Sequence, residues 1–170
     1  GEVPVLNVLC VLKNGGGFDA EWVRKLRDGV ARNLSFKHRF FCLSDVEVPC
    51  ERIALEHDWP GWFAKIEMFR PGVITDRTIY LDLDTVITAS FDKIYDVDYD
   101  FATLRSVWNP DMIGTGMMWF RDESCVPHHI YKKFAKQPGA WIAHMHRNGK
   151  GTYVGDQGFI WDCLEHKADK

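Results

Sequence analysis

Two aspartates, Asp82 and Asp84, follow the hydrophobic run Thr78–Leu81 and are separated by one leucine. In an extended strand, side chains alternate between faces, so both carboxylates are predicted to point the same way, roughly 6 to 7 Å apart. At an effective dielectric constant near 20, their repulsion costs on the order of 2 to 3 kcal/mol, in addition to desolvation. A divalent cation, or protonation of one aspartate, would relieve it. The pair therefore predicts a metal site with Asp82 and Asp84 as ligands.

A simpler interpretation makes one aspartate an exposed turn residue and the other a helix cap. The neighbours of the pair are apolar or β-branched, among them Leu81, Leu83, Thr85 and Val86. Such neighbours are typical of a strand and its end, so they favour the metal-site interpretation.

Apolar strands and amphipathic segments alternate ahead of the aspartates. Residues 3–12 are almost continuously apolar, as in a central strand covered on both faces, and lead into the glycine-rich turn 14–17. Asp19 is the predicted N-cap of a helix that continues to about Asn33. The next elements are predicted as strands 39–43 and 52–55, a helix opened by residues 59–61 and closed by 71–72, and the strand that carries the aspartates.

The pattern changes after the aspartates. Residues 99–107 and 112–120 are predicted strands that enter the sheet antiparallel, and helices are predicted at 126–136, 141–147 and 159–166. This order predicts an α/β fold, with a mostly parallel, Rossmann-like sheet flanked by helices and antiparallel strands after the aspartates. One domain is expected over residues 1–170, with its site at the carboxyl ends of the strands.

Composition limits the classes of partner and compartment. The net charge of -3, from 21 basic and 24 acidic side chains, indicates no general attraction to nucleic acid. The longest apolar stretch, residues 3–12, is about half of the ~20 residues that a spanning helix needs, so no membrane span is predicted. Five cysteines without a CxxC spacing are typical of reduced thiols and predict a cytoplasmic protein.

The order of four short motifs resembles that of GT-A-fold nucleotide-sugar glycosyltransferases, most closely the glycogenin-like, retaining type with a DxD motif. The motifs are residues 59–65, 80–84, 114–118 and 155–157, and the resemblance extends from Val3 to about Trp161. Each motif is short, so their order is more specific than any one of them. The resemblance implies a glycosyltransferase of the hexosyltransferase type with a GT-A-like domain.

The resemblance also implies a donor site. Asp82 and Asp84 would hold Mn²⁺ or Mg²⁺, which in turn grips the donor diphosphate, and their oxygen ligands suit either cation. The cation would neutralise charge on the departing nucleoside diphosphate. Lys65 matches a basic residue that reaches the donor phosphate or sugar, and a solvated helix lysine is the alternative. The other implied donor-binding residues are Leu12, Leu83, Gly114, Thr115 and Gly116.

Asp156 and Gln157 match the acid and amide that, in similar enzymes, lie beside the transferred sugar. The resemblance implies that Asp156 holds sugar hydroxyls and that Gln157 stabilises positive charge at the anomeric centre through its carbonyl dipole. Asp156 also fits the N-cap of a helix after Gly155, and the two roles are compatible. Gly114 and Gly116 fit either close backbone approach to the sugar or a strand bulge.

Two departures from the family pattern concern the donor and the metal. Gly114 stands where similar enzymes often keep an amide, and Gly158 where some keep another acid. Such enzymes usually take a third metal ligand, a histidine, from a C-terminal segment that nothing after Gln157 reproduces. His166 is the only histidine late enough, and its setting is typical of a frayed helix end. A C-terminally truncated domain, a water ligand or a residue from a partner are the alternatives.

Two loop residues are candidates for binding the acceptor. Trp108 lies in a proline-containing loop, where an aromatic ring can stack on a sugar. Asp111, in the same loop, is the acid that could serve as the base of an inverting enzyme. The other tryptophans are expected mostly in the core, Trp62 among them.

The resulting prediction is metal-dependent transfer of a sugar from a nucleotide sugar, expected to be a UDP-sugar, to a carbohydrate acceptor with retention of configuration. Residues 81–86 also resemble the signature of haloacid-dehalogenase-like phosphatases, Mg²⁺-dependent enzymes in which Asp82 would be the nucleophile. That signature normally opens its domain, whereas here it follows about half the chain. A non-catalytic nucleotide-sugar-binding domain is the third reading.

Overall fold

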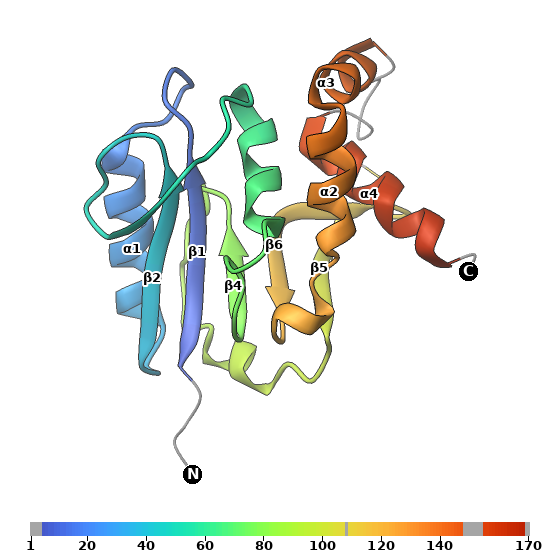
Figure 1. The fold of residues 1–170 in the computed structure, drawn as a ribbon. Coiled ribbons are helices and arrows are strands. Elements are labelled where there is room, and N and C mark those ends of the chain that lie inside the picture. Colours follow the sequence, from blue (N-terminus) through green and yellow to red (C-terminus); the bar gives the residue numbers. More distant parts are fainter. Residues whose placement is uncertain (1–4, 108, 148–154, 169–170) are drawn as a thin grey trace.

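The computed structural model describes residues 5–107, 109–147 and 155–168. In them one sheet has the strand order β3-β2-β1-β4-β6-β5 (Figure 1). The strands are β1 (Leu6–Leu12), β2 (His38–Ser44), β3 (Glu51–Ala54), β4 (Thr78–Leu81), β5 (Phe101–Arg105) and β6 (Ile113–Phe120). β1 pairs in parallel with β2 and β4, β2 pairs in parallel with β3, and β6 is antiparallel to both β4 and β5. The predicted mostly parallel sheet, with antiparallel strands after the aspartates, is confirmed.

Helices cover both faces of the sheet (Figure 1). On one face, α1 (Ala20–Asn33) packs Val23, Leu26 and Val30 against one side of β1. On the other face lie the 3₁₀ helix η1 (Gly61–Phe69), α2 (His128–Lys136) and α4 (Gly155–Ala168), with α3 (Pro138–Arg147) against them. Asp19 is the predicted N-cap of α1, and its carboxylate accepts the Glu21 N–H. Two apolar cores therefore hold the central strands between them.

The segment predicted as a helix after Trp59 forms η1, a 3₁₀ helix of nine residues. Runs of this tight helix longer than about four residues are uncommon, because their hydrogen-bond geometry is poorer than that of an α-helix. Residues 63–69 are all buried, including the charged side chains of Lys65 and Glu67. η1 therefore carries two ionisable groups into the interior.

The aspartate pair lies in the turn after β4, so the prediction that a strand carries both residues is wrong. β4 ends at Leu81, and the Asp82 N–H donates to the carbonyl of Gly116 at 2.9 Å. The Thr85 N–H then donates to the carbonyl of Asp82 at 3.0 Å, which closes a turn and leaves Asp84 exposed. The turn residue of the simpler interpretation is thus correct for Asp84.

Among the described residues, none of the helices has both the length and the apolar character that crossing a bilayer requires.

Candidate functional site

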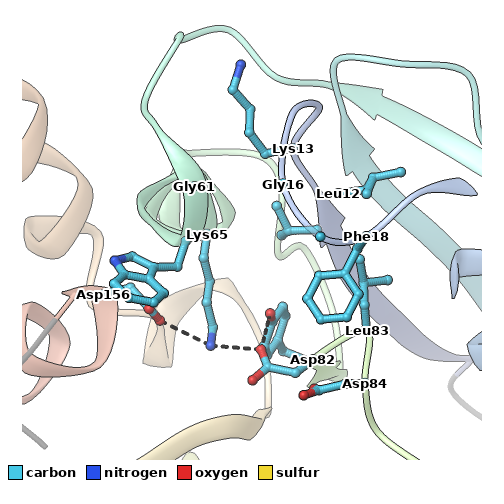
Figure 2. Close-up of a pocket in the computed structure, with 14 residues that line it drawn as sticks. Leu12, Lys13, Gly16, Phe18, Gly61, Lys65, Asp82, Leu83, Asp84 and Asp156 are labelled. Atoms are coloured by element: carbon cyan, nitrogen blue, oxygen red, sulfur yellow. Dashed lines mark hydrogen bonds and ion pairs between the residues drawn. The ribbon is translucent and has the colours of Figure 1, made fainter. Parts of the chain in front are cut away.

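A pocket of about 380 Å³ opens where β1 and β4 end (Figure 2). Its walls come from the end of β1 and the loop after it, from η1, from the turn after β4 and from the start of α4. The carboxyl edge of a parallel sheet is the usual place for a ligand in such folds. The lining residues are Val11, Leu12, Lys13, Gly16, Gly17, Phe18, Gly61, Trp62, Lys65, Tyr80, Asp82, Leu83, Asp84 and Asp156.

Lys65 joins two carboxylates at the base of the pocket. Its Nζ lies 3.0 Å from Asp82 Oδ1 and 3.1 Å from Asp156 Oδ2, as the dashed lines in Figure 2 show. Nζ also donates to Thr115 Oγ1 at 3.3 Å. Burial alone would lower the pKa of Lys65, but Asp156 and Asp82 outweigh it and the pKa is raised. Lys65 is therefore a buried cation, and the solvated-lysine alternative is wrong.

Tyr80 completes the surroundings of Asp82. The phenol donates to Asp82 Oδ1 at 2.6 Å, and burial followed by the Asp82 charge raises the pKa of Tyr80 well above its usual value. The phenol therefore stays protonated as a donor. Because Oδ1 accepts from both Lys65 and Tyr80, Oδ2 is the oxygen of Asp82 left for a ligand. A Cβ on Gly116 would come within 3.2 Å of this Oδ2.

The two glycines of residues 114–116 lie in an irregular part of β6. The register of β5 against β6 shifts between Thr103 and Leu104, which pair with Met118 and Gly114. The Thr103 hydroxyl lies 2.7 Å from the Gly114 carbonyl and 3.1 Å from that of Met117, so it bridges the irregularity. This register shift agrees with the strand-bulge alternative for the two glycines, and their close approach to a sugar stays a prediction.

Asp156 and Gln157 lie in the first turn of α4. The helix begins at Gly155, so the prediction of Asp156 as N-cap is wrong, although a carboxylate in this turn suits the helix dipole. Asp156 is 8% exposed and lines the pocket. The Gln157 carbonyl oxygen accepts the Thr115 N–H at 3.2 Å, and Gln157 is not among the lining residues. Its predicted contact with an anomeric centre stays a prediction.

The aspartates offer a partial ligand set for a cation. Asp82 Oδ2 and the exposed Asp84 carboxylate are hard oxygen donors on one pocket wall. Mg²⁺ commonly binds to one or two carboxylates and completes its shell with water and substrate phosphate, so the pair fits this cation or Mn²⁺. Among the described residues, no group of three or more His, Cys, Asp or Glu could hold a metal. The His166 side chain lies outside the described part of the chain.

Of the two acceptor candidates from the sequence, only Asp111 is among the described residues. Trp108 lies outside the described residues. Asp111 is exposed, its N–H is bonded to the Asn109 side chain, and it is not among the lining residues.

Trp62, expected in the core, is instead 57% exposed and lines the pocket, so that expectation is wrong.

Several pocket residues were missed by sequence reasoning. The loop after β1 contributes Lys13 and Phe18, and Lys13 Nζ pairs with Asp45 at 2.7 Å and Asp58 at 2.6 Å. The position of this loop, directly after the central strand, was a usable signal because ligands bind at that edge. The sequence contained a weaker signal for Tyr80. Tyr80 lies two positions before Asp82, and in a strand this spacing places both side chains on the same face of the sheet.

No protein-family model and no curated protein matches this chain. Solved glycosyltransferase structures do match its fold. The apo-form glycosyltransferase GlyE of Streptococcus pneumoniae TIGR4 has a TM-score of 0.69 at 15% identity, over 96% of this chain. The galactosyltransferase LgtC, solved with donor and acceptor sugar analogues, has 0.63 at 12% identity, over 93% of this chain and 70% of its own. Mouse xyloside xylosyltransferase 1 has 0.56 at 14% identity, over 96% and 83%.

These similarities confirm the predicted GT-A-type fold. The identities of 12 to 15% are too low to carry more than the fold, and the glycogenin-like type stays a prediction. This chain spans 44% of the length of the GlyE chain.

Proposed function

We propose that this chain is a glycosyltransferase domain that transfers a sugar from a nucleotide sugar, with UDP as the nucleotide, to a carbohydrate hydroxyl. One observation carries the proposal. In a fold shared with glycosyltransferases, the pocket at the strand ends brings together Asp82, Asp84, Lys65 and Asp156. The resemblance to GT-A-fold glycosyltransferases had implied the same four residues.

The donor diphosphate would bind at the aspartates. Asp82 and Asp84 would hold Mn²⁺ or Mg²⁺, and a bound cation supplies charge neutralisation for the departing nucleoside diphosphate. Lys65 orients Asp82 through Oδ1 and leaves Oδ2 for this task. Since Lys65 stays cationic, it also lowers the negative potential that the two carboxylates would otherwise present to a diphosphate.

The remaining donor contacts follow the shape of the pocket. Leu12 and Leu83 line it and would contact the nucleoside sugar or base, while Asp156 would accept hydrogen bonds from the transferred sugar. Gln157 and residues 114–116 stand behind Asp156, because Thr115 Oγ1 donates to Asp156 at 3.4 Å and the Thr115 N–H donates to Gln157. We propose them as residues that position Asp156.

Retention of configuration is the proposed stereochemical outcome. An inverting enzyme needs a carboxylate base directed at the acceptor. Among the described lining residues, the carboxylates are Asp82 and Asp84, assigned to the cation, and Asp156, held by Lys65. Asp111 does not line the pocket. These placements support a route in which the departing phosphate takes the acceptor proton.

Calorimetry of UDP binding with and without Mn²⁺ tests the donor site. We expect binding to require Mn²⁺ and to be lost in Asp84→Asn, because the exchange removes a ligand charge at an exposed position. Glu47→Gln is a matched control, since the Glu47 side chain is 95% exposed and is not among the residues that line the pocket. Binding of equal strength without metal would overturn the site.

A panel of sugar nucleotides, followed by UDP release, tests turnover. Release that depends on an added glycoside supports transfer, whereas tight binding without release supports the non-catalytic alternative. Hydrolysis of a generic phosphate ester that is abolished in Asp82→Asn, without UDP release, would support the phosphatase instead.

A further inference from the structure

Trp62 is a large aromatic residue left open to solvent beside the ionic groups of the pocket. Its side chain lines the pocket and it is 57% exposed, although tryptophan is usually well buried. Trp62 precedes Lys65 by three residues in η1, and side chains at this spacing eclipse in a 3₁₀ helix. Trp62 therefore lies on the helix side that carries Lys65, with Lys65 buried and the indole exposed.

The indole is held in place by the backbone at the start of α4. A Cβ at Gly155 would lie 2.5 Å from Trp62 Nε1 and 2.8 Å from Cε2, closer than any side chain could approach. Gly155 also has a φ of +64°, which disfavours other residues at this position. The ring thus packs against a position where only glycine fits, immediately before Asp156. One edge is fixed while the indole remains largely exposed.

A fixed, exposed aromatic face next to a carboxylate is suited to a sugar ring. The apolar C–H face of a pyranose can pack on the indole, and such a pyranose would lie beside the transferred sugar that Asp156 is proposed to bind. Small-ligand sites commonly combine an aromatic wall with a few convergent polar groups in this way.

The arrangement favours the acceptor over the donor as the occupant. Lys65, whose side chain is 8% exposed, marks the inner part of the site, and the donor diphosphate is proposed to bind at the aspartate that Lys65 contacts, Asp82, and at Asp84. Trp62 is at the open rim, where a second substrate would enter. The carboxylates that line the pocket also disfavour an anionic sugar, because the cations Lys65 and Lys13 are each already paired with two aspartates.

We infer that Trp62 forms the acceptor subsite and that a neutral pyranoside stacks on its exposed face. This inference rests on the proposed function, since it assumes that the inner part of the pocket holds the donor. Trp62 would then be an acceptor-binding residue among the residues that the structure describes.

Binding of methyl glycosides tests the inference directly. With UDP and Mn²⁺ present, saturation-transfer NMR should detect methyl β-D-glucopyranoside or the galactoside on the native chain, and methyl β-D-glucuronide more weakly. Trp62→Ala should weaken the neutral glycosides at least about tenfold, which corresponds to about 1.4 kcal/mol. Trp62→Phe should retain part of the affinity, and Tyr99→Ala is the control because Tyr99 is 69% exposed and does not line the pocket.

UDP affinity separates this inference from the proposed function. Trp62→Ala should bind UDP with Mn²⁺ as tightly as the native chain. Unchanged glycoside affinity in Trp62→Ala overturns the inference, and so does an equal loss of UDP affinity, which would place Trp62 in the donor site. Glycosides that bind through Trp62 to a chain without metal-dependent UDP binding would contradict the proposed function but support the stacking role.

Discussion

At the residue scale, Lys65 is the group that balances the aspartates. The sequence had indicated a cation between Asp82 and Asp84, because two carboxylates at that spacing repel each other. The structure places an ammonium between Asp82 and Asp156 instead, with both distances close to 3 Å. A buried lysine with two carboxylate partners has the hydrogen bonds that such a charge requires. Lys65 therefore offsets part of the negative charge, and we expect the proposed cation to serve substrate binding rather than folding.

Lys65→Met should destabilise the fold strongly. It leaves Asp156 buried without its counter-charge, and breaking a buried ion pair in this way typically costs about 3 to 5 kcal/mol. Urea denaturation at pH 8 measures the change in the free energy of unfolding. Glu47→Gln, at an exposed position, should stay within about 0.5 kcal/mol of the native chain. A Lys65→Met chain as stable as the native one would contradict the role of the ion pair.

The stability that Lys65 contributes should be lost only at alkaline pH. Its pKa is raised in the folded state, so the contribution is complete below the unfolded-state value near 10.4 and disappears as the pH rises through the folded value. The difference in unfolding free energy between native and Lys65→Met chains should be constant from about pH 8 to 10 and decrease above that. Denaturation curves across this range measure it. A difference that already falls between pH 8 and 9 would contradict the raised pKa.

At the element scale, the irregular part of β6 shapes the aspartate turn. The Gly116 carbonyl accepts the Asp82 N–H, and the Gly116 Cα faces Asp82 Oδ2. The turn after β4 is thus held by Gly116, a residue of β6 that lies 34 positions after Asp82 in the chain.

Gly116→Ala should weaken metal-dependent UDP binding about tenfold while the fold persists. The added Cβ would lie 3.2 Å from Asp82 Oδ2, the oxygen proposed to face the cation, and would displace it. Calorimetry with UDP and Mn²⁺ provides the measurement. Gly139→Ala is the matched control, because a Cβ there meets nothing within 4 Å. Equal affinities for the two variants would show that Oδ2 does not bind the cation.

Features set by nearby residues were predictable from the sequence, and features set by distant ones were not. The N-cap at Asp19 was predicted correctly because its partner, the Glu21 N–H, is two residues away. Asp84 was assigned to a strand, which was wrong because the turn depends on Gly116, a residue distant in the sequence. Trp62 was assigned to the core because no residue near it in the sequence indicates its contact with Gly155. The parallel sheet was predictable, since it follows from the alternation of elements along the chain.

At the scale of the whole molecule, η1 connects the core to the pocket. It packs into the core that it shares with α2 and α4, and it carries both Lys65 and Trp62. Glu67, fully buried in the same helix, accepts the N–H groups of Glu56 at 2.8 Å and His57 at 3.2 Å. Its carboxylate also pairs with Arg70 at 2.6 Å. Glu67 therefore ties the loop after β3 to the helix that positions the site.

Glu67→Gln should both destabilise the fold and weaken the site. The amide keeps the shape but removes the charge that Arg70 pairs with and replaces an acceptor of a backbone N–H by a donor, for which we expect a cost of about 3 kcal/mol. Urea denaturation measures this cost, and amide hydrogen exchange at Glu56 and His57 should become faster. Because η1 carries residues of both proposed subsites, UDP and glycoside affinities should fall together, unlike in Trp62→Ala. Loss of only one affinity would show that η1 does not couple the core to the whole pocket.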